Sequence, residues 1–164
     1  MFKKLLAVVC ALGLVSACAS KQEGAEIYGN GNGGWNDNVD ISALEATGLT
    51  NKFNKNTTPV VYFKLNSSDI DATAKSALAE QAAWLKDNPR ALIVIEGNCD
   101  ERGTTEYNFA LGERRANAAR RYLIANGVEA SRIRTISYGK EKPVATGSNE
   151  EAWAKNRNAT TIAY

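Results

Sequence analysis

The chain has 164 residues, of which 44% are apolar and 23% are charged, with 20 Lys and Arg against 18 Asp and Glu and no histidine. The missing histidine argues against zinc amidases of the common type and against cysteine nucleophiles activated by an imidazole. Two lysines lie in the first four residues, so the remaining chain is near neutral and no nucleic-acid partner is expected.

The N-terminal stretch has the layout of a secretion signal. Two lysines precede an apolar run from Leu5 to Val15, which is too short to span a bilayer as a mature helix. The run ends in Ser16, Ala17 and Cys18, which resembles a bacterial lipobox. We therefore expect residues 1–17 to be a signal peptide and Cys18 to carry lipid, the alternative being an ordinary signal with an incidental cysteine.

The next segment, residues 18–58, is predicted to be a lipidated N-terminus followed by a flexible linker. Glycine and asparagine dominate its first half, and apolar periodicity is missing. Within it, residues 41–49 are predicted to form one or two helical turns.

Residues 59–164 are predicted to form one α/β domain. Apolar, β-branched runs predict strands at 60–65, 91–97, 133–139 and 159–164, and helical spacing predicts helices at 67–89, 107–126 and 149–157. Ser68 is the expected cap of the first helix, and Asn88-Pro89 the expected stop. The alternating order favours parallel crossovers and a four-stranded sheet covered by helices.

The stretch 97–116, after the second strand, concentrates opposite charges. Asp100 and Glu101 lie in the loop, and a helical projection places Arg115 within the apolar face of the following helix. A guanidinium facing the core needs acceptors or anions. Two readings remain open: a structural salt bridge from Arg115 to Asp100 or Glu101, or a site in which Arg115 takes a carboxylate and Asp100 an ammonium. Cys99 is expected to be a small core residue.

Four ordered words of this sequence carry a family resemblance. They are DERGTTEYN (100–108), LGERRANAARRYL (111–123), SYGKEKP (137–143) and KNR (155–157). They resemble the peptidoglycan-binding domain of the outer-membrane protein A (OmpA) family, and more closely its peptidoglycan-associated lipoproteins. The resemblance implies an OmpA-like α+β sandwich with a mixed four-stranded sheet.

The same resemblance implies a non-catalytic protein without cofactor or metal. Its ligand would be the D-centre of meso-diaminopimelate in the peptidoglycan stem peptide, and its protein partners TolB and possibly TolA. It would maintain outer-membrane integrity and constriction during division, anchored in the outer membrane with the domain in the periplasm. Ala19 after Cys18 agrees with that membrane, because aspartate there retains lipoproteins in the inner membrane of enteric bacteria.

Site residues follow from the matching words. Asp100 and Arg115 match the family's central ligand pair. The resemblance extends the peptidoglycan site to Asn66, Asn98, Glu101, Asn108 and Leu111, and a partner surface to Glu101, Arg102, Tyr107, Asn156 and Arg157. The chain departs from the family where Lys64 and Asn66 replace acids and where Asn98 replaces a histidine or tyrosine.

Two other functions are weighed against a wall-binding lipoprotein. A peptidoglycan-cleaving enzyme would need separated carboxylates, whereas Asp100 and Glu101 are adjacent in sequence. A periplasmic adaptor that binds a TolB-type partner with weak or no wall binding is supported by the altered Lys64 and Asn66.

Overall fold

The structure is a computed structural model that describes residues 48–164. Its elements are α2 (Gly48–Asn56), β1 (Val60–Tyr62), α3 (Ala72–Asp87), β2 (Ile93–Asn98), α4 (Thr105–Ala125), the 3₁₀ turn η2 (Ala130–Arg132), β3 (Ile133–Gly139), α5 (Glu150–Asn156) and β4 (Asn158–Ala163). The predicted signal peptide, Cys18 and most of the predicted linker lie outside the described residues.

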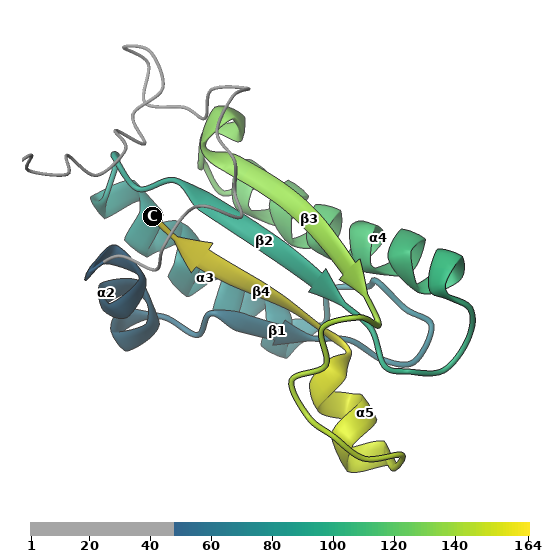
Figure 1. Cartoon of the computed structure of the whole chain (residues 1–164). Coiled ribbons are helices and arrows are strands. Elements are labelled where there is room, and N and C mark those ends of the chain that lie inside the picture. Colours follow the sequence, from purple (N-terminus) through teal and green to yellow (C-terminus); the bar gives the residue numbers. More distant parts are fainter. Residues whose placement is uncertain (1–47) are drawn as a thin grey trace, which may run out of the picture.

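The four strands form one mixed sheet in the order β1-β4-β2-β3 (Figure 1). β2 and β3 are parallel, and β4 runs antiparallel to both β1 and β2. The predicted fold class, an OmpA-like α+β domain with a mixed four-stranded sheet, is confirmed. The strand between β1 and β2 is β4, which is the last strand in the sequence. Local sequence patterns do not encode this arrangement.

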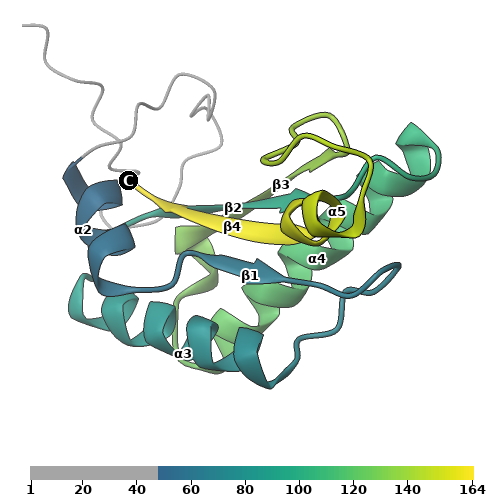
Figure 2. The same cartoon turned by 90° about the horizontal axis from the view of Figure 1, so that it is seen from below.

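Helices α3 and α4 cover one face of the sheet (Figure 2). The core lies between them and the strands, and it is apolar because every second residue of each strand points toward the helices. Its largest fully buried aliphatic members on these elements are Leu78, Leu85, Ile93, Ile95 and Leu123. None of the described helices is long and apolar enough to cross a membrane.

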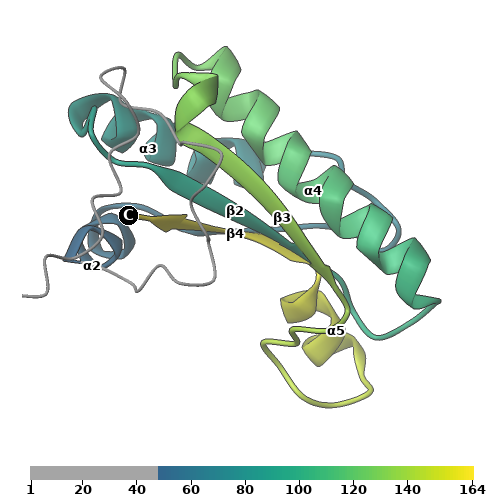
Figure 3. The ribbon, with the colours of Figure 1, turned by 45° about the horizontal axis from the view of Figure 1, so that its top comes forward.

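Helix α4 lies very close to the sheet (Figure 3), and two glycines allow this. A Cβ atom added at Gly97 would collide with the carbonyl of Gly112, and one added at Gly112 would collide with the Ser137 hydroxyl. The close approach brings the side chain of Arg115, one turn further along α4, within reach of the carboxyl end of β2.

The segment predicted as linker contains a helix that belongs to the domain, which corrects its boundary. Phe53 of α2 is fully buried and packs edge-on against Trp84, with ring centroids 5.1 Å apart. The Thr50 hydroxyl donates to the Ala163 carbonyl (2.6 Å), which ties α2 to β4. A polar helix with one aromatic anchor carries no clear periodicity, so its sequence resembles a linker. The predicted helical turns at 41–49 lie mostly outside the described residues.

The ends of the predicted elements differ from the structure in small ways. Asp71, rather than Ser68, caps α3 by accepting a hydrogen bond from the Ala74 N–H (2.8 Å). The predicted stop at Asn88 agrees with the structure, where this residue is the C-cap of α3. β1 is only three residues long, although the Phe63 N–H just after it still donates to the Arg157 carbonyl (2.9 Å).

Candidate functional site

The loop after β2 is fixed by hydrogen bonds from the start of α4. Residues 99–104 end at Thr104, whose hydroxyl accepts from the Tyr107 N–H (3.2 Å) and caps the helix. The side-chain amide of Asn108 donates to the carbonyls of Arg102 (2.8 Å) and Thr104 (3.0 Å). These bonds hold the loop in one shape at the carboxyl end of β2.

Arg115 is buried beside this loop, as its place on the apolar face of the helix predicted. Only 1% of its surface is exposed. Its Nε donates to the Ser67 carbonyl (3.0 Å), Nη1 to the Asn98 carbonyl (2.7 Å) and the Cys99 sulfur (3.3 Å), and Nη2 to the Lys64 carbonyl (3.2 Å). A guanidinium has five N–H donors. These four bonds leave one Nη2 hydrogen without a partner among the described residues.

The charge of Arg115 has no bonded counter-ion in the described part of the chain. No ion pair joins it to Asp100 or Glu101, so the predicted structural salt bridge is not formed. Burial lowers the pKa of the Arg115 guanidinium, while Cys99 and Asp100 act in the opposite direction. The Phe63 ring lies 5.3 Å from the guanidinium carbon and stabilises the cation weakly. An arginine stays protonated in such a site, which therefore favours an anion.

Asp100 is equally buried, at 4% exposure, but its carboxylate is already paired. Arg102 binds it with Nε on one oxygen (3.0 Å) and Nη2 on the other (2.7 Å). Arg157, the C-cap of α5 just before β4, approaches with Nη1 at 3.4 Å. Burial alone would raise the pKa of Asp100, but the bonds from Arg102 and Arg157 outweigh it and hold that pKa below its ordinary value. Asp100 is therefore ionised at neutral pH.

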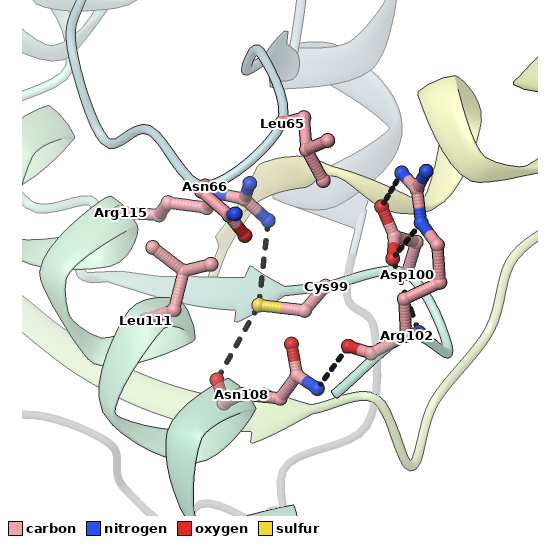
Figure 4. Close-up of a pocket in the computed structure, with 8 residues that line it drawn as sticks. All are labelled: Leu65, Asn66, Cys99, Asp100, Arg102, Asn108, Leu111 and Arg115. Atoms are coloured by element: carbon pink, nitrogen blue, oxygen red, sulfur yellow. Dashed lines mark hydrogen bonds and ion pairs between the residues drawn. The ribbon is translucent and has the colours of Figure 1, made fainter. Parts of the chain in front are cut away.

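A small hollow lies between the two charged groups, as Figure 4 shows. Its enclosed space is only about 10 Å³, and the figure rises to about 170 Å³ when the open solvent at its mouth is counted. Its lining comes from the loop after β1, the loop after β2 and the first turns of α4, namely Leu65, Asn66, Cys99, Asp100, Arg102, Asn108, Leu111 and Arg115. Asn66 has a φ of +53°, a left-handed conformation that asparagine tolerates better than most residues.

Most of the predicted peptidoglycan residues meet at this hollow. Those lining it are Asn66, Asp100, Asn108, Leu111 and Arg115. Asn98 contributes its carbonyl to Arg115, but its side-chain amide donates to Asn158 Oδ1 (2.9 Å), away from the hollow. Its own Oδ1 is buried and has no hydrogen-bond partner within residues 48–164. A direct ligand contact by the Asn98 side chain is therefore not supported, because that side chain points along the sheet to β4.

Glu101 does not line the hollow either. Its side chain is exposed, and its Oε1 accepts a hydrogen bond from the indole N–H of Trp153 in α5 (3.0 Å). Tyr107 is 44% exposed on the first turn of α4. Both residues are accessible, as a partner surface requires.

Two residues predicted for the partner surface are internal. The Asn156 side chain accepts from the N–H groups of Val144 (2.8 Å) and Ala145 (2.9 Å) and clamps the loop before α5. Arg157 donates to the Phe63 carbonyl (3.1 Å) and to Asp100. Both side chains are more than 90% buried because these bonds hold β4 and α5 to the rest of the domain. For these two side chains the prediction of a surface contact was wrong.

The sequence did not single out Leu65 and Cys99 as lining residues. Cys99 is buried, as expected of a core residue, yet its sulfur also borders the hollow and its thiol donates to the Asn108 carbonyl (3.3 Å). Burial raises the pKa of this thiol, which keeps it protonated. Leu65 is half-exposed. The one sequence signal for its role is that it directly precedes Asn66, which was predicted to belong to the site.

The site combines one buried cation with a spare donor and one buried carboxylate, on opposite sides of a small hollow. Such an arrangement suits a compact group that carries a carboxylate and an ammonium, because each charge meets its opposite. Within residues 48–164, no group of cysteine, aspartate and glutamate side chains is arranged to hold a metal ion.

The comparisons with known proteins identify one family and its fold. Residues 62–157 match the OmpA family. A peptidoglycan-associated lipoprotein of Mesorhizobium japonicum is 42% identical over 96% of this chain and 89% of its own length, and one of Pseudomonas aeruginosa is 41% identical over 95% and 94%. The crystal structure of the peptidoglycan-associated lipoprotein from Burkholderia pseudomallei is 44% identical, with a TM-score of 0.64 over 65% of this chain and 91% of that one.

Proposed function

The chain belongs to the OmpA family and, within it, to the peptidoglycan-associated lipoproteins, and on that premise we propose that it binds peptidoglycan non-covalently from a lipid anchor in the outer membrane. The ligand we propose is the D-centre of meso-diaminopimelate in the stem peptide. It carries one carboxylate and one ammonium on the same carbon, which matches the two charges of the hollow.

The observation that carries this proposal is the state of Arg115. Burying a guanidinium beside an open hollow without a bonded anion costs desolvation free energy. A bound anionic group would offset that cost. The ligand carboxylate would accept the remaining Nη2 hydrogen, and the main-chain carbonyls that hold Arg115 would keep its orientation fixed beforehand. The ligand ammonium would lie against Asp100, which is ionised.

A catalytic role is not part of the proposal. A glycosidase needs one carboxylic acid that keeps its proton near neutral pH. Burial would raise the pKa of Asp100, but Arg102 and Arg157 hold it below its ordinary value. Hydrogen bonds from Ser148 and Trp153 likewise lower the pKa of Glu101. Neither residue is prepared to donate a proton to a leaving group.

The N-terminal region supplies the tether in this proposal. Lipid on Cys18 would insert into the outer membrane, and two or three acyl chains anchor far more firmly than one. Since the domain begins by residue 48, the tether is residues 19–47, which is 29 residues. Fully extended, these could span about 100 Å. Tethering keeps the domain near the wall and makes rebinding fast.

We also infer from the family resemblance that the protein works with the Tol system, through TolB and possibly TolA, during cell division. Glu101 and Tyr107 are accessible and adjoin the lining residues Asp100 and Asn108 in sequence, and they would form part of that partner surface. Wall and partner would then meet the domain at neighbouring positions.

The test is retention of the purified protein on isolated peptidoglycan sacculi. Wild-type protein should be pulled down by sacculi that contain meso-diaminopimelate and not by sacculi that contain lysine, which lacks the second carboxylate. Arg115→Ala should lose retention by about 100-fold, the size expected for removing a charge-assisted bond to a carboxylate. Arg121→Ala, which removes an exposed arginine at the far end of α4, is the matched control and should bind normally.

A second candidate function is a periplasmic adaptor that binds a protein partner and holds the wall weakly or not at all. The observation in its favour is that Asp100 is already paired with Arg102 and Arg157. The same pull-down separates the two functions. Retention on diaminopimelate sacculi that is weak and unaffected by Arg115→Ala would favour the adaptor and count against wall binding.

A further inference from the structure

The carboxylate proposed for the ligand ammonium is occupied in this structure by a side chain of the same loop. Arg102 lies over Asp100 with both oxygens engaged, at 3.0 Å and 2.7 Å, and its main-chain N–H adds a third bond at 3.2 Å. A guanidinium fork on a carboxylate is the strongest arrangement that such a pair can adopt. An ammonium that enters the hollow therefore has to compete with Arg102.

Arg102 already touches a second surface that can hold its charge. Its guanidinium carbon lies 4.0 Å from the centre of the Trp153 ring, and its Nη1 lies 4.0 Å from Glu150 Oε2, both on α5. Its side chain is 33% exposed, whereas that of Asp100 is 5% exposed. The arginine is thus at the rim of the hollow, between the buried carboxylate and an aromatic and acidic surface that can hold a cation.

Asp100 itself would stay in place when Arg102 leaves. Arg157, at the end of α5, contacts the same carboxylate (3.4 Å) and is fixed by the Phe63 carbonyl (3.1 Å) and by Glu150 (2.6 Å). The side chain of Arg157 is 8% exposed and has no comparable freedom. One of the two arginines on Asp100 is therefore structural and the other is free to exchange.

We propose that Arg102 is a specificity-determining residue that fills the ammonium position of the empty site and, when the ligand binds, releases Asp100 while keeping its contacts with Trp153 and Glu150. The inference rests on the proposed function and deepens it. A ligand with an ammonium replaces one cation on Asp100 by another, so the buried carboxylate is never left unpaired. A ligand with a carboxylate alone cannot displace Arg102. The site thereby rejects simple carboxylates and accepts amino acid centres.

This arrangement makes an unusual prediction: removing a positive charge strengthens binding. Arg102→Gln takes away the competitor and leaves Asp100 oriented by Arg157. We expect a stem peptide that ends in meso-diaminopimelate to bind the variant about tenfold more tightly than wild type, the size of one charge-assisted pair at a partly exposed position. Arg102→Lys, which keeps the charge but not the fork, should give a smaller gain.

The experiment is calorimetric titration of the purified chain with two probes. One is the meso-diaminopimelate stem peptide, and the other is the same peptide with the D-centre amine acetylated. Arg121→Gln is the control for loss of charge, and it should leave both affinities unchanged. The decisive quantity is the ratio of the two affinities. It should rise about tenfold in Arg102→Gln, because only the probe with a free amine gains.

The possible results separate this inference from the proposed function. If wild type binds the free-amine probe but Arg102→Gln, with an unchanged melting temperature, binds it equally or more weakly, Arg102 positions Asp100 and the inference is overturned while wall binding stands. If wild type binds neither probe, the proposed function fails and takes the inference with it. A ratio that does not change, with both affinities shifted together, also rejects the displacement.

Discussion

Two buried arginines lie in different regions of this domain and differ in what surrounds them. Arg132, in η2, donates to the carbonyls of Leu85 (3.1 Å), Asn88 (2.8 Å) and Ala91 (2.8 Å) at the end of α3. Arg115 likewise donates to three main-chain carbonyls. Both guanidiniums are at most 5% exposed, and burial lowers the pKa of each. The chemistry of holding the two side chains is the same.

The two regions differ in what surrounds each guanidinium apart from the carbonyls that hold it. Arg132 satisfies carbonyls of one helix end, where a cation also complements the helix dipole, and it packs as a clamp. Arg115 is held by two separate loops and borders a hollow with a carboxylate on its other side. A buried arginine is therefore not a site in itself. It becomes one when its fixed charge borders open space and an opposed group.

The largest expected effect that tests this comparison comes from Arg132→Ala. It should lower the free energy of unfolding by about 3 kcal/mol, because several buried carbonyls lose their donor. The affinity of the folded molecules for sacculi should not change. Urea denaturation and sacculus retention of the same sample measure both quantities. Loss of retention at a temperature where the variant is fully folded would break the distinction between clamp and site.

Acid should affect the two regions differently, with a smaller effect. The folded-state pKa of Asp100 is lowered, since bonds from Arg102 and Arg157 outweigh burial. Its contribution to stability is therefore complete above its ordinary pKa of 3.8 and is lost as pH falls through the lowered value. The hydrogen-bond partners of Arg132 named above are carbonyls, which do not titrate, although the carboxylate of Glu129 also acts on its charge.

The measurement is urea denaturation at pH 7, 4 and 2.5 for wild type and Asp100→Asn. We expect the stability gap between them to shrink as the pH falls below about 4. A gap that stays constant over this range would show that the Asp100 charge is not what its two arginines stabilise.

The smallest effect is expected at the rim of the hollow, from Asn66→Gly. Glycine adopts a φ of +53° without strain but loses more entropy on folding, so the two contributions nearly cancel. Stability should change by no more than about 0.5 kcal/mol. Retention on sacculi should fall only modestly if the Asn66 side chain contacts the ligand. A loss as large as that of Arg115→Ala would move the centre of the site to the first loop.

Local sequence patterns predicted the part of the fold that depends on local periodicity. The alternation of strands and helices in 60–163 and the inward direction of Arg115 followed from spacing alone, and the structure agrees with both. The helix α2 was missed because it is polar apart from Phe53 and is held by contacts with Trp84 and β4. The clamp role of Arg132 was also missed, because a three-residue turn has no periodicity to analyse.

The pairing of the site could not be predicted from spacing. Asp100 and Arg115 were identified, but the partners of Asp100 depend on how the chain closes. Arg157 is 57 residues away in sequence and reaches Asp100 because β4 inserts next to β2. Arg102 is two residues away, and its choice of Asp100 over Glu150 or solvent is set by the loop conformation. A local sequence pattern contains no information on which distant strands pair or on the conformation that a loop adopts.

The central place of β4 has a consequence for biosynthesis. β4 is the one strand of the described sheet that pairs with β1, and it also pairs with β2, so the sheet cannot close until residues 158–163 have been made. A chain synthesised from its N-terminus therefore lacks the pairing of β4 with β1 and β2 during most of its synthesis. The domain therefore gains its central strand pairing only once β4 is available, at the end of its own synthesis.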